Sequence, residues 1–216
     1  MALITREKKD PVSIITLLGD GLLNPALLSE MNHALDTIEA SEGPACLVIT
    51  GEGKSFSTGF DLDAFFHASA GDVEAMVDQG IALLRRLLSS GIPSIAAVNG
   101  HAFGIGAMLA LACDYRFMRA DRGFFCLPEI DLKAPLPPPM TALLKLKLAP
   151  AIVRDALLTG KRISGMEALS SGIVDAVYPL GELLPRAVEH IAPLAGKDRS
   201  TYASMKRLLH RDVLGP

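Results

Sequence analysis

Two glycine-rich stretches are the parts of this sequence best suited to chemistry. Residues 50–62 read TGEGKSFSTGFDL and residues 99–106 read NGHAFGIG, and each follows a short apolar run. Glycine permits tight turns and close backbone approach. The first N–H groups of a helix lack partners within it, so they can stabilise negative charge. Taken alone, each stretch also fits a simple connection between a buried strand and a helix.

Two nucleotide-binding patterns come close to these stretches without matching them. The phosphate-loop pattern needs a glycine five residues before Gly53, and that position is Val48. The dinucleotide pattern that would start at Gly104 needs a third glycine where Leu109 stands. The sequence therefore predicts neither a nucleoside triphosphatase nor a dinucleotide site.

The composition is typical of one ordinary α/β domain. The chain has 216 residues, half of them hydrophobic, and a formal net charge of −3. Its acidic and basic residues are interspersed and it lacks tryptophan, which argues against nucleic acid as a partner. The histidines have no metal-ligand spacing, so no metal is predicted. The three cysteines lie in apolar runs and are expected to be buried, reduced thiols.

No targeting or membrane segment is predicted. Residues 1–10 lack the apolar stretch of a secretory signal, and residues 212–216 do not end in a peroxisomal tripeptide. The apolar stretch 92–113 is interrupted by Pro93 and several glycines, which favours a buried strand, turn and helix over a membrane span. We therefore expect a soluble intracellular protein without a membrane partner, cytoplasmic if the source is bacterial.

The hydrophobic pattern predicts strands joined by helices in the first half and mainly helices afterwards. The predicted strands are 12–18, 46–50, 94–98, 115–118, 124–127 and 173–178. The predicted helices are 26–40, 72–89, 106–112, 140–148, 151–158, 165–171, 182–195 and 199–209. The segments 51–63, 100–104 and 135–139 are expected to be loops or turns. The alternation of strand and helix favours a parallel sheet with crossover helices.

Taken together, the two glycine-rich stretches resemble the enoyl-CoA hydratase/isomerase, or crotonase, superfamily. Residues 112–114 (ACD) and 168–177 (ALSSGIVDAV) are also similar to that family, and the resemblance extends over roughly residues 10–210. It implies the α/β ClpP/crotonase fold, with stacked ββα units and a helical C-terminal part. The chain would form a single domain, residues 1–216, with the ββα core in 1–140 and the mainly helical part in 141–216. The resemblance also implies a homotrimer.

The resemblance assigns the chemistry to two backbone N–H groups and one side chain. The N–H groups of Phe60 and Ile105 would form an oxyanion hole for a thioester oxygen. Family hydratases use two glutamates, and the first position is occupied here by Met108, which cannot transfer a proton. The second position is Glu129, within 125–131 (FCLPEID).

A single carboxylate suits the shift of a double bond, and the surroundings of Glu129 resemble monofunctional Δ3,Δ2-enoyl-CoA isomerases. The sequence thus predicts such an isomerase, acting on unsaturated fatty acyl-CoA in fatty acid β-oxidation. Coenzyme A would be part of the acyl-CoA thioester substrate, and no separate cofactor is expected. The alternatives are an enoyl-CoA hydratase, another acyl-CoA lyase of the same fold, or a non-catalytic acyl-CoA-binding protein.

Further residues are predicted to bind the substrate by their positions in the same motifs. They are Lys54, Phe56, Ser57, Gly59, Asp61, Leu62, Gly104 and Met108. Lys54 would approach a CoA phosphate, and Met108 would either line the acyl pocket or pack in the core. Phe65, Phe66 and residues 72–89 and 135–148 are expected to set the depth of the acyl pocket. Whether Asp131 or His101 assists Glu129 stays open.

Overall fold

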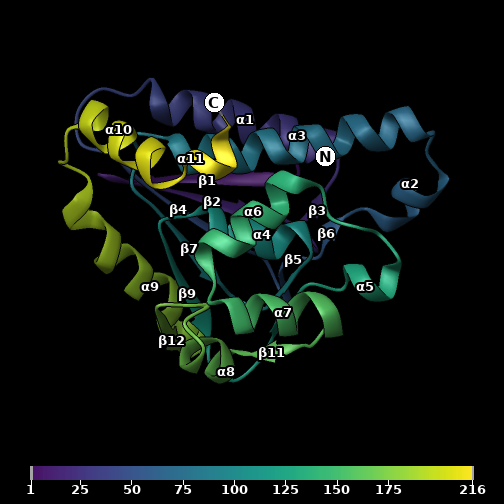
Figure 1. Cartoon of the computed structure of the whole chain (residues 1–216). Helices are drawn as coiled ribbons and strands as arrows, with labels where there is room; N and C mark the ends of the chain where they lie inside the picture. The colour runs from purple at the N-terminus through teal and green to yellow at the C-terminus, as the bar shows by residue number, and fades with distance from the viewer. Residues whose placement is uncertain (1, 216) are drawn as a thin grey trace.

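The computed structural model describes residues 2–215, with the backbone alone at position 64, and contains a six-stranded sheet (Figure 1). The strand order is β1-β2-β4-β7-β9-β12, and every neighbouring pair is parallel except β1 and β2. The bounds are Ile4–Lys9 (β1), Val12–Leu17 (β2), Cys46–Gly51 (β4), Ser94–Val98 (β7), Tyr115–Arg119 (β9) and Ala176–Tyr178 (β12). Strand β7 is buried throughout. This explains its continuous apolar run, because parallel strands are usually covered on both faces.

Strands of the large sheet continue after short turns into a second, four-stranded sheet. Its order is β11-β10-β8-β5, and β3 pairs with β6 in a separate two-stranded sheet. The bounds are Leu22–Leu23 (β3), Ser55–Ser57 (β5), Gly59–Phe60 (β6), His101–Phe103 (β8), Phe124–Cys126 (β10) and Ile163–Ser164 (β11). The successions β4-β5, β7-β8 and β9-β10 each lead on to a helix. The stacked ββα units expected from the sequence are therefore present.

Helices surround the sheets and dominate the C-terminal part, as predicted. The bounds are Pro25–Glu39 (α1), Leu62–His67 (α2), Ala70–Ser89 (α3), Ile105–Ala112 (α4), Glu129–Leu132 (α5), Pro138–Lys147 (α6), Pro150–Thr159 (α7), Gly165–Ser170 (α8), Leu180–Ile191 (α9), Arg199–Leu209 (α10) and Arg211–Leu214 (α11). None of the helices in residues 2–215 combines the length and hydrophobicity that crossing a membrane requires.

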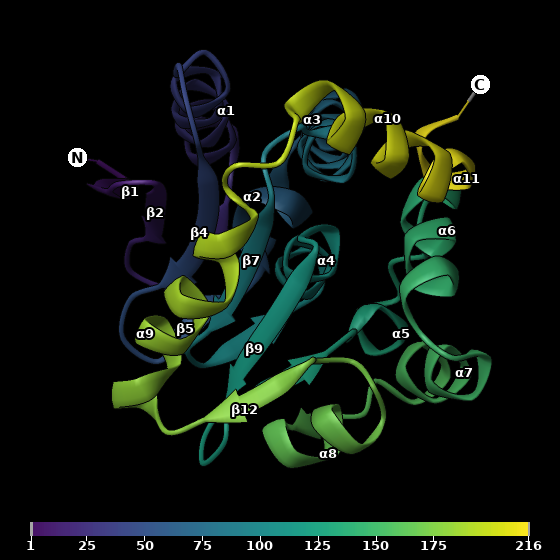
Figure 2. The same ribbon diagram turned by 90° about the vertical axis from the view of Figure 1, so that its left-hand side faces the viewer.

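Helix α4 lies at the centre of the main core. All of its residues are buried, and it packs against α3, α6 and the sheet. A second, smaller core fills the opposite face of the sheet, beneath α9. Figure 2 shows α4 on one side of β7 and β9 and α9 on the other. Because α4 is enclosed on every side, its first residue is held firmly in place.

Three predicted loops contain regular structure. The segment 51–63 holds β5, β6 and the start of α2, and the turn 100–104 holds β8. These strands have two or three residues, which is too short for hydrophobic periodicity to reveal. Pro138 and Pro139, predicted as loop, form the first turn of α6, where a missing N–H costs no helical hydrogen bond.

Other differences concern the edges of the sheets. The strand predicted at 173–178 is confined to β12 because residues 173–175 form a bend before it. Strand β1 was not predicted because most of its residues are charged and exposed. Such residues suit an edge strand, since they hinder pairing with another chain. The short elements β3, β11, α2 and α5 were also not predicted.

A buried ion pair attaches α10 to the sheet. Asp114 lies between α4 and β9, and its Oδ2 atom accepts hydrogen bonds from Ser94 N at 2.8 Å and the Tyr202 hydroxyl at 3.1 Å. Lys206 Nζ lies 2.7 Å from Asp114 Oδ1, although the angle is outside the range of a directed hydrogen bond. Lys206 is only 4% exposed. Lys206 is therefore a buried cation in direct contact with the Asp114 carboxylate.

Replacing Lys206 with alanine should destabilise the protein. The substitution removes the cation in direct contact with the Asp114 carboxylate, and breaking a buried ion pair in this way typically costs about 3–5 kcal/mol. Urea unfolding measures the loss. The neighbouring, exposed Arg207→Ala variant is the control and should change the free energy of unfolding by less than about 0.5 kcal/mol. Equal losses in the two variants would contradict a stabilising role for the ion pair.

Candidate active site

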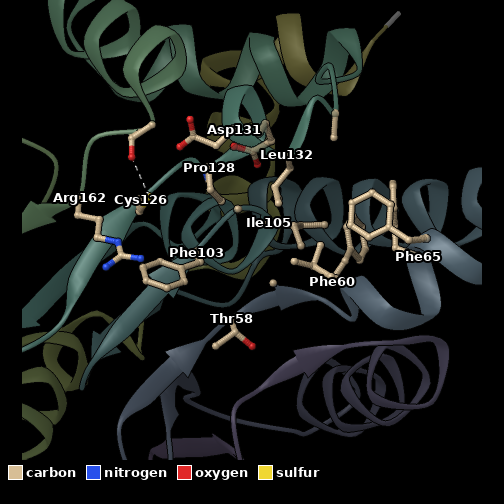
Figure 3. A pocket seen from close by; sticks show the side chains of 17 residues that line it. Thr58, Phe60, Phe65, Phe103, Ile105, Cys126, Pro128, Asp131, Leu132 and Arg162 are labelled. Carbon is tan, nitrogen blue, oxygen red and sulfur yellow. Dashed lines mark hydrogen bonds between the residues drawn. The ribbon is translucent and has the colours of Figure 1, made fainter.

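One cavity brings together both glycine-rich stretches and Glu129 (Figure 3). Its volume is about 300 Å³. The wall is formed by residues 58–60, by residues of α2, by the connection from β8 to α4, by residues of α5 and by the segment after α7. Residues from four separate regions of the sequence, 58–66, 103–105, 126–134 and 160–162, thus line one cavity.

The close approach of Gly59 to β8 joins the two glycine-rich stretches. Gly59 has a φ of 85°, and a Cβ atom at this position would lie 2.7 Å from Phe103 O and 3.6 Å from Ile105 N. A side chain would therefore push the two segments apart. Gly104 has a φ of 53°, and a Cβ atom there would lie 3.2 Å from Glu129 Oε1. The left-handed backbone at Gly104 thus lies beside the carboxylate.

The two residues predicted to supply N–H donors both line this cavity. Ile105 is the first residue of α4, so its N–H has no acceptor within the helix. The N-terminus of α4 also carries a partial positive charge that favours an anion. Phe60 ends β6, one residue after the close approach at Gly59. That these N–H groups form an oxyanion hole stays a prediction.

Glu129 presents a carboxyl group to a largely apolar environment. It is the first residue of α5 and is half-buried. Within residues 2–215, its Oε2 atom is buried and has no hydrogen-bond partner. Burial raises the pKa of Glu129, although a hydrogen bond from its own backbone opposes the rise. The carboxylate is therefore a stronger base than an exposed glutamate.

The structure separates the predicted binding residues into two groups. Gly59, Leu62 and Gly104 line the cavity. The wall does not include the following residues, which lie in the core, in the neighbouring strand or on the surface: Lys54, Phe56, Ser57, Asp61 and Met108.

Packing explains why these side chains do not reach the cavity. Phe56 and Met108 are fully buried in the main core. The Ser57 hydroxyl donates to Gly21 O at 2.6 Å and accepts from Gly59 N at 3.2 Å, so it supports the turn at Gly59. Lys54 is exposed on the loop before β5. Asp61 precedes α2 and accepts a bond from Phe65 N through its carbonyl oxygen.

The sequence did not decide whether Asp131 or His101 assists Glu129, and the structure places these two residues differently. Asp131 lines the same cavity, and its Oδ2 atom lies 2.5 Å from where a Cβ at Gly160 would be, so glycine leaves room for it. His101 does not line the cavity and packs against the rings of Phe103 and Phe124. Burial lowers the pKa of His101, and nearby arginines add to this effect.

Phe65 and Phe66, expected to shape the acyl pocket, are present in the wall. The rings of Phe60 and Phe65 stack with centroids 6.2 Å apart, and Phe66 meets Phe65 edge-on at 5.8 Å. Further lining residues were not predicted. They include Thr58, Phe103, Cys126, Pro128, Leu132, Ala134, Gly160 and Arg162.

Two of these unpredicted residues have contacts that indicate their roles. The Cys126 thiol donates to Gly160 O at 3.3 Å, and burial raises its pKa, so it is not an activated nucleophile. The Arg162 guanidinium lies 5.9 Å from the centre of the Phe103 ring. Gly160 and Arg162 follow α7 and are far in sequence from the glycine-rich stretches. Only a similarity of the segment 160–162 to the family could have indicated that these residues reach the cavity.

Comparison with known proteins gives consistent similarities. The family model for enoyl-CoA hydratase/isomerase matches residues 19–214. Enoyl-CoA delta isomerase 1, peroxisomal, from Arabidopsis thaliana is 35% identical over 218 residues, covering 96% of this chain and 90% of the relative. Carnitinyl-CoA dehydratase from Escherichia coli is 39% identical over 164 residues, covering 74% of this chain and 61% of the relative.

Solved structures show the same fold. A probable enoyl-CoA hydratase from Mycobacterium tuberculosis superposes with a TM-score of 0.92 at 27% identity, covering 99% of this chain and 90% of that one. Human mitochondrial delta3-delta2-enoyl-CoA isomerase superposes with a TM-score of 0.92 at 23% identity, covering 99% and 85%. At 23% identity, the likeness to the human enzyme shows a shared fold alone.

Replacing Glu129 with glutamine should stabilise the protein at neutral pH. The pKa of Glu129 is higher in the folded than in the unfolded state, so folding favours the protonated form and stability is lost as pH rises. Glutamine does not ionise and avoids this loss. The melting temperature of the variant should exceed that of wild type at pH 7, and the difference should shrink below pH 4.5. Exposed Glu74→Gln is the control, and a matching shift there would contradict the explanation.

Proposed function

Because this chain belongs to the enoyl-CoA hydratase/isomerase family, we propose that it shifts a carbon–carbon double bond in unsaturated fatty acyl-CoA. The supporting observation is the position of the Glu129 carboxyl group, beside Gly104 and on the same cavity wall as Phe60 and Ile105. Its homologues named enoyl-CoA delta isomerase make the chain an isomerase. The assignment to a Δ3,Δ2-enoyl-CoA isomerase is the finer part of the proposal.

The proposed reaction is a proton transfer between two carbons. The thioester oxygen accepts hydrogen bonds from the N–H groups of Phe60 and Ile105. Glu129 removes a proton from C2 of the 3-enoyl thioester, and the electron pair passes into a dienolate whose charge rests on the thioester oxygen. The protonated Glu129 then returns the proton to C4, which leaves the double bond between C2 and C3. Each N–H donor is expected to contribute roughly 3–4 kcal/mol to stabilising that charge.

The buried position of Glu129 suits both steps. A C–H group beside a thioester is far less acidic than a carboxylic acid. Raising the pKa of Glu129 brings it closer to the pKa of that C–H group, which favours the proton transfer. The shortage of polar partners at Oε2 also keeps the carboxyl group available to the substrate. The same group can therefore act first as the base and then as the acid.

Hydration is the second candidate, and the dehydratase relatives are the observation in its favour. Water addition in this family uses a second glutamate, at the position of Met108. Met108 has no proton to transfer and packs inside the main core rather than at the cavity. The structure therefore favours isomerisation.

The first experiment supplies trans-3-hexenoyl-CoA and follows the absorbance of the conjugated product. Glu129→Gln should lower kcat by about 10²–10⁴-fold, the range typical of general acid–base catalysis. Glu74→Gln should match wild type. Mass spectrometry should show a product of unchanged mass, whereas a gain of one water would favour hydration. Wild type inactive over several chain lengths, or full activity in Glu129→Gln, would overturn the proposal.

The pH profile tests the role of Glu129 as the base. The free enzyme must carry Glu129 ionised, so kcat/KM should fall as pH drops through the raised pKa. The acid limb should therefore lie above 4.5, the ordinary value for glutamate. The residual rate of Glu129→Gln should lack this limb. A limb that persists in the variant would assign the titration to another group.

A further inference from the structure

We propose that the acyl chain beyond C4 leaves the catalytic cavity past Glu129 and lies in an adjoining apolar groove formed by Ile130, Pro135, Leu136 and Leu157. This inference rests on the proposed function. It adds a binding site for the distal part of the substrate, and it predicts a preference for medium and long acyl chains.

The groove adjoins the catalytic cavity. Its volume is about 380 Å³, and Glu129 and Ala134 line both spaces. Its other walls are mainly aliphatic, and Ile130 is 50% exposed. An aliphatic chain that covered these side chains would remove apolar surface from water on both sides, which is favourable.

A sharp backbone reversal makes the wall between the two spaces thin. Helix α5 is a single turn and ends at Lys133, whose φ of 55° is the one positive value among the described non-glycine residues. This conformation is unfavourable for a residue with a Cβ atom. It lets Ala134 N donate to Glu129 O at 3.0 Å. Ala134 therefore returns beside Glu129, and both residues line the cavity as well as the groove.

The proposed chemistry places the chain at this wall. If Glu129 exchanges protons with both C2 and C4, then C4 lies next to its carboxyl group. The part of the acyl chain from C5 onward therefore starts beside Glu129. Glu129 also lines the groove, so the groove lies on a route open to the rest of the chain. The aromatic cluster of Phe65 and Phe66 is the other apolar surface near the cavity. Figure 3 shows Phe65 beside Phe60, on the opposite side of Ile105 from Asp131. The aromatic cluster therefore lies next to Phe60, one of the two proposed donors to the thioester oxygen.

Binding of saturated thioesters tests the groove without requiring turnover. Each buried methylene is worth roughly fourfold in affinity. Wild type should therefore bind decanoyl-CoA at least about 10-fold more tightly than hexanoyl-CoA by isothermal titration calorimetry. Ile130→Gln and Leu157→Gln should each reduce this ratio by about threefold or more. Because Ile130 is half exposed, its variant keeps the test valid even if Leu157→Gln folds poorly.

Two further variants decide between the groove and the aromatic cluster. Leu158 is adjacent to Leu157 on α7, is 69% exposed and lies outside the groove, so Leu158→Gln should keep the wild-type ratio. If Phe66→Gln lowers the ratio while the groove variants do not, the chain runs along α2 and the inference is wrong. Equal affinity of wild type for both thioesters would also overturn it.

The outcomes separate this inference from the proposed function. Tighter binding of decanoyl-CoA that depends on Ile130 and Leu157, without turnover of any 3-enoyl-CoA, would support the groove and overturn the isomerase. Isomerisation of 3-enoyl-CoA with no dependence on the groove residues would do the reverse. No binding of either thioester would overturn both.

Discussion

The backbone of Gly59 lies so close to the carbonyl oxygen of Phe103 that no side chain fits between them, and the site depends on this contact. It holds the end of β6 against the start of α4. Because α4 is buried on all sides, the position of Ile105 is fixed by the core itself. Gly104 then allows the Glu129 carboxyl group to lie directly beside this junction. Three elements distant in sequence are thus positioned by two glycines with left-handed backbones.

The site retains a carboxyl group in surroundings that do not stabilise its charge. Oε2 of Glu129 has no partner in the part of the chain described, and burial raises its pKa. Such burial reduces stability at neutral pH, yet it strengthens the base that the proposed reaction needs. The same apolar surroundings extend through Ala134 into the groove beneath Glu129. Catalytic strength and binding of an aliphatic chain would then have one physical origin.

The fold explains why these residues meet although they are far apart in the chain. Each ββα unit passes from the six-stranded sheet into a smaller sheet and delivers its connection to the same region. Long elements such as α1, α3 and α10 were predictable because their hydrophobic periodicity spans several turns. The strands β5, β6 and β8 were not, since two or three residues carry no period. They form because neighbouring strands offer hydrogen bonds, which is a tertiary effect.

The sequence by itself determined the glycines at positions 59 and 104, the carboxyl group at 129 and the absence of an acid at 108. These are properties of residue type, and the resemblance of the surrounding sequence to the enoyl-CoA hydratase/isomerase family was needed to predict from them the fold and the kind of chemistry. Only the tertiary structure decided which predicted residues reach the cavity. It buried Phe56 and Met108 in the core and brought Gly160 and Arg162 to the wall. It also removed Glu129 Oε2 from water and opened a groove beside it. Burial and cavities arise from packing between distant segments, and no local pattern of residues specifies them.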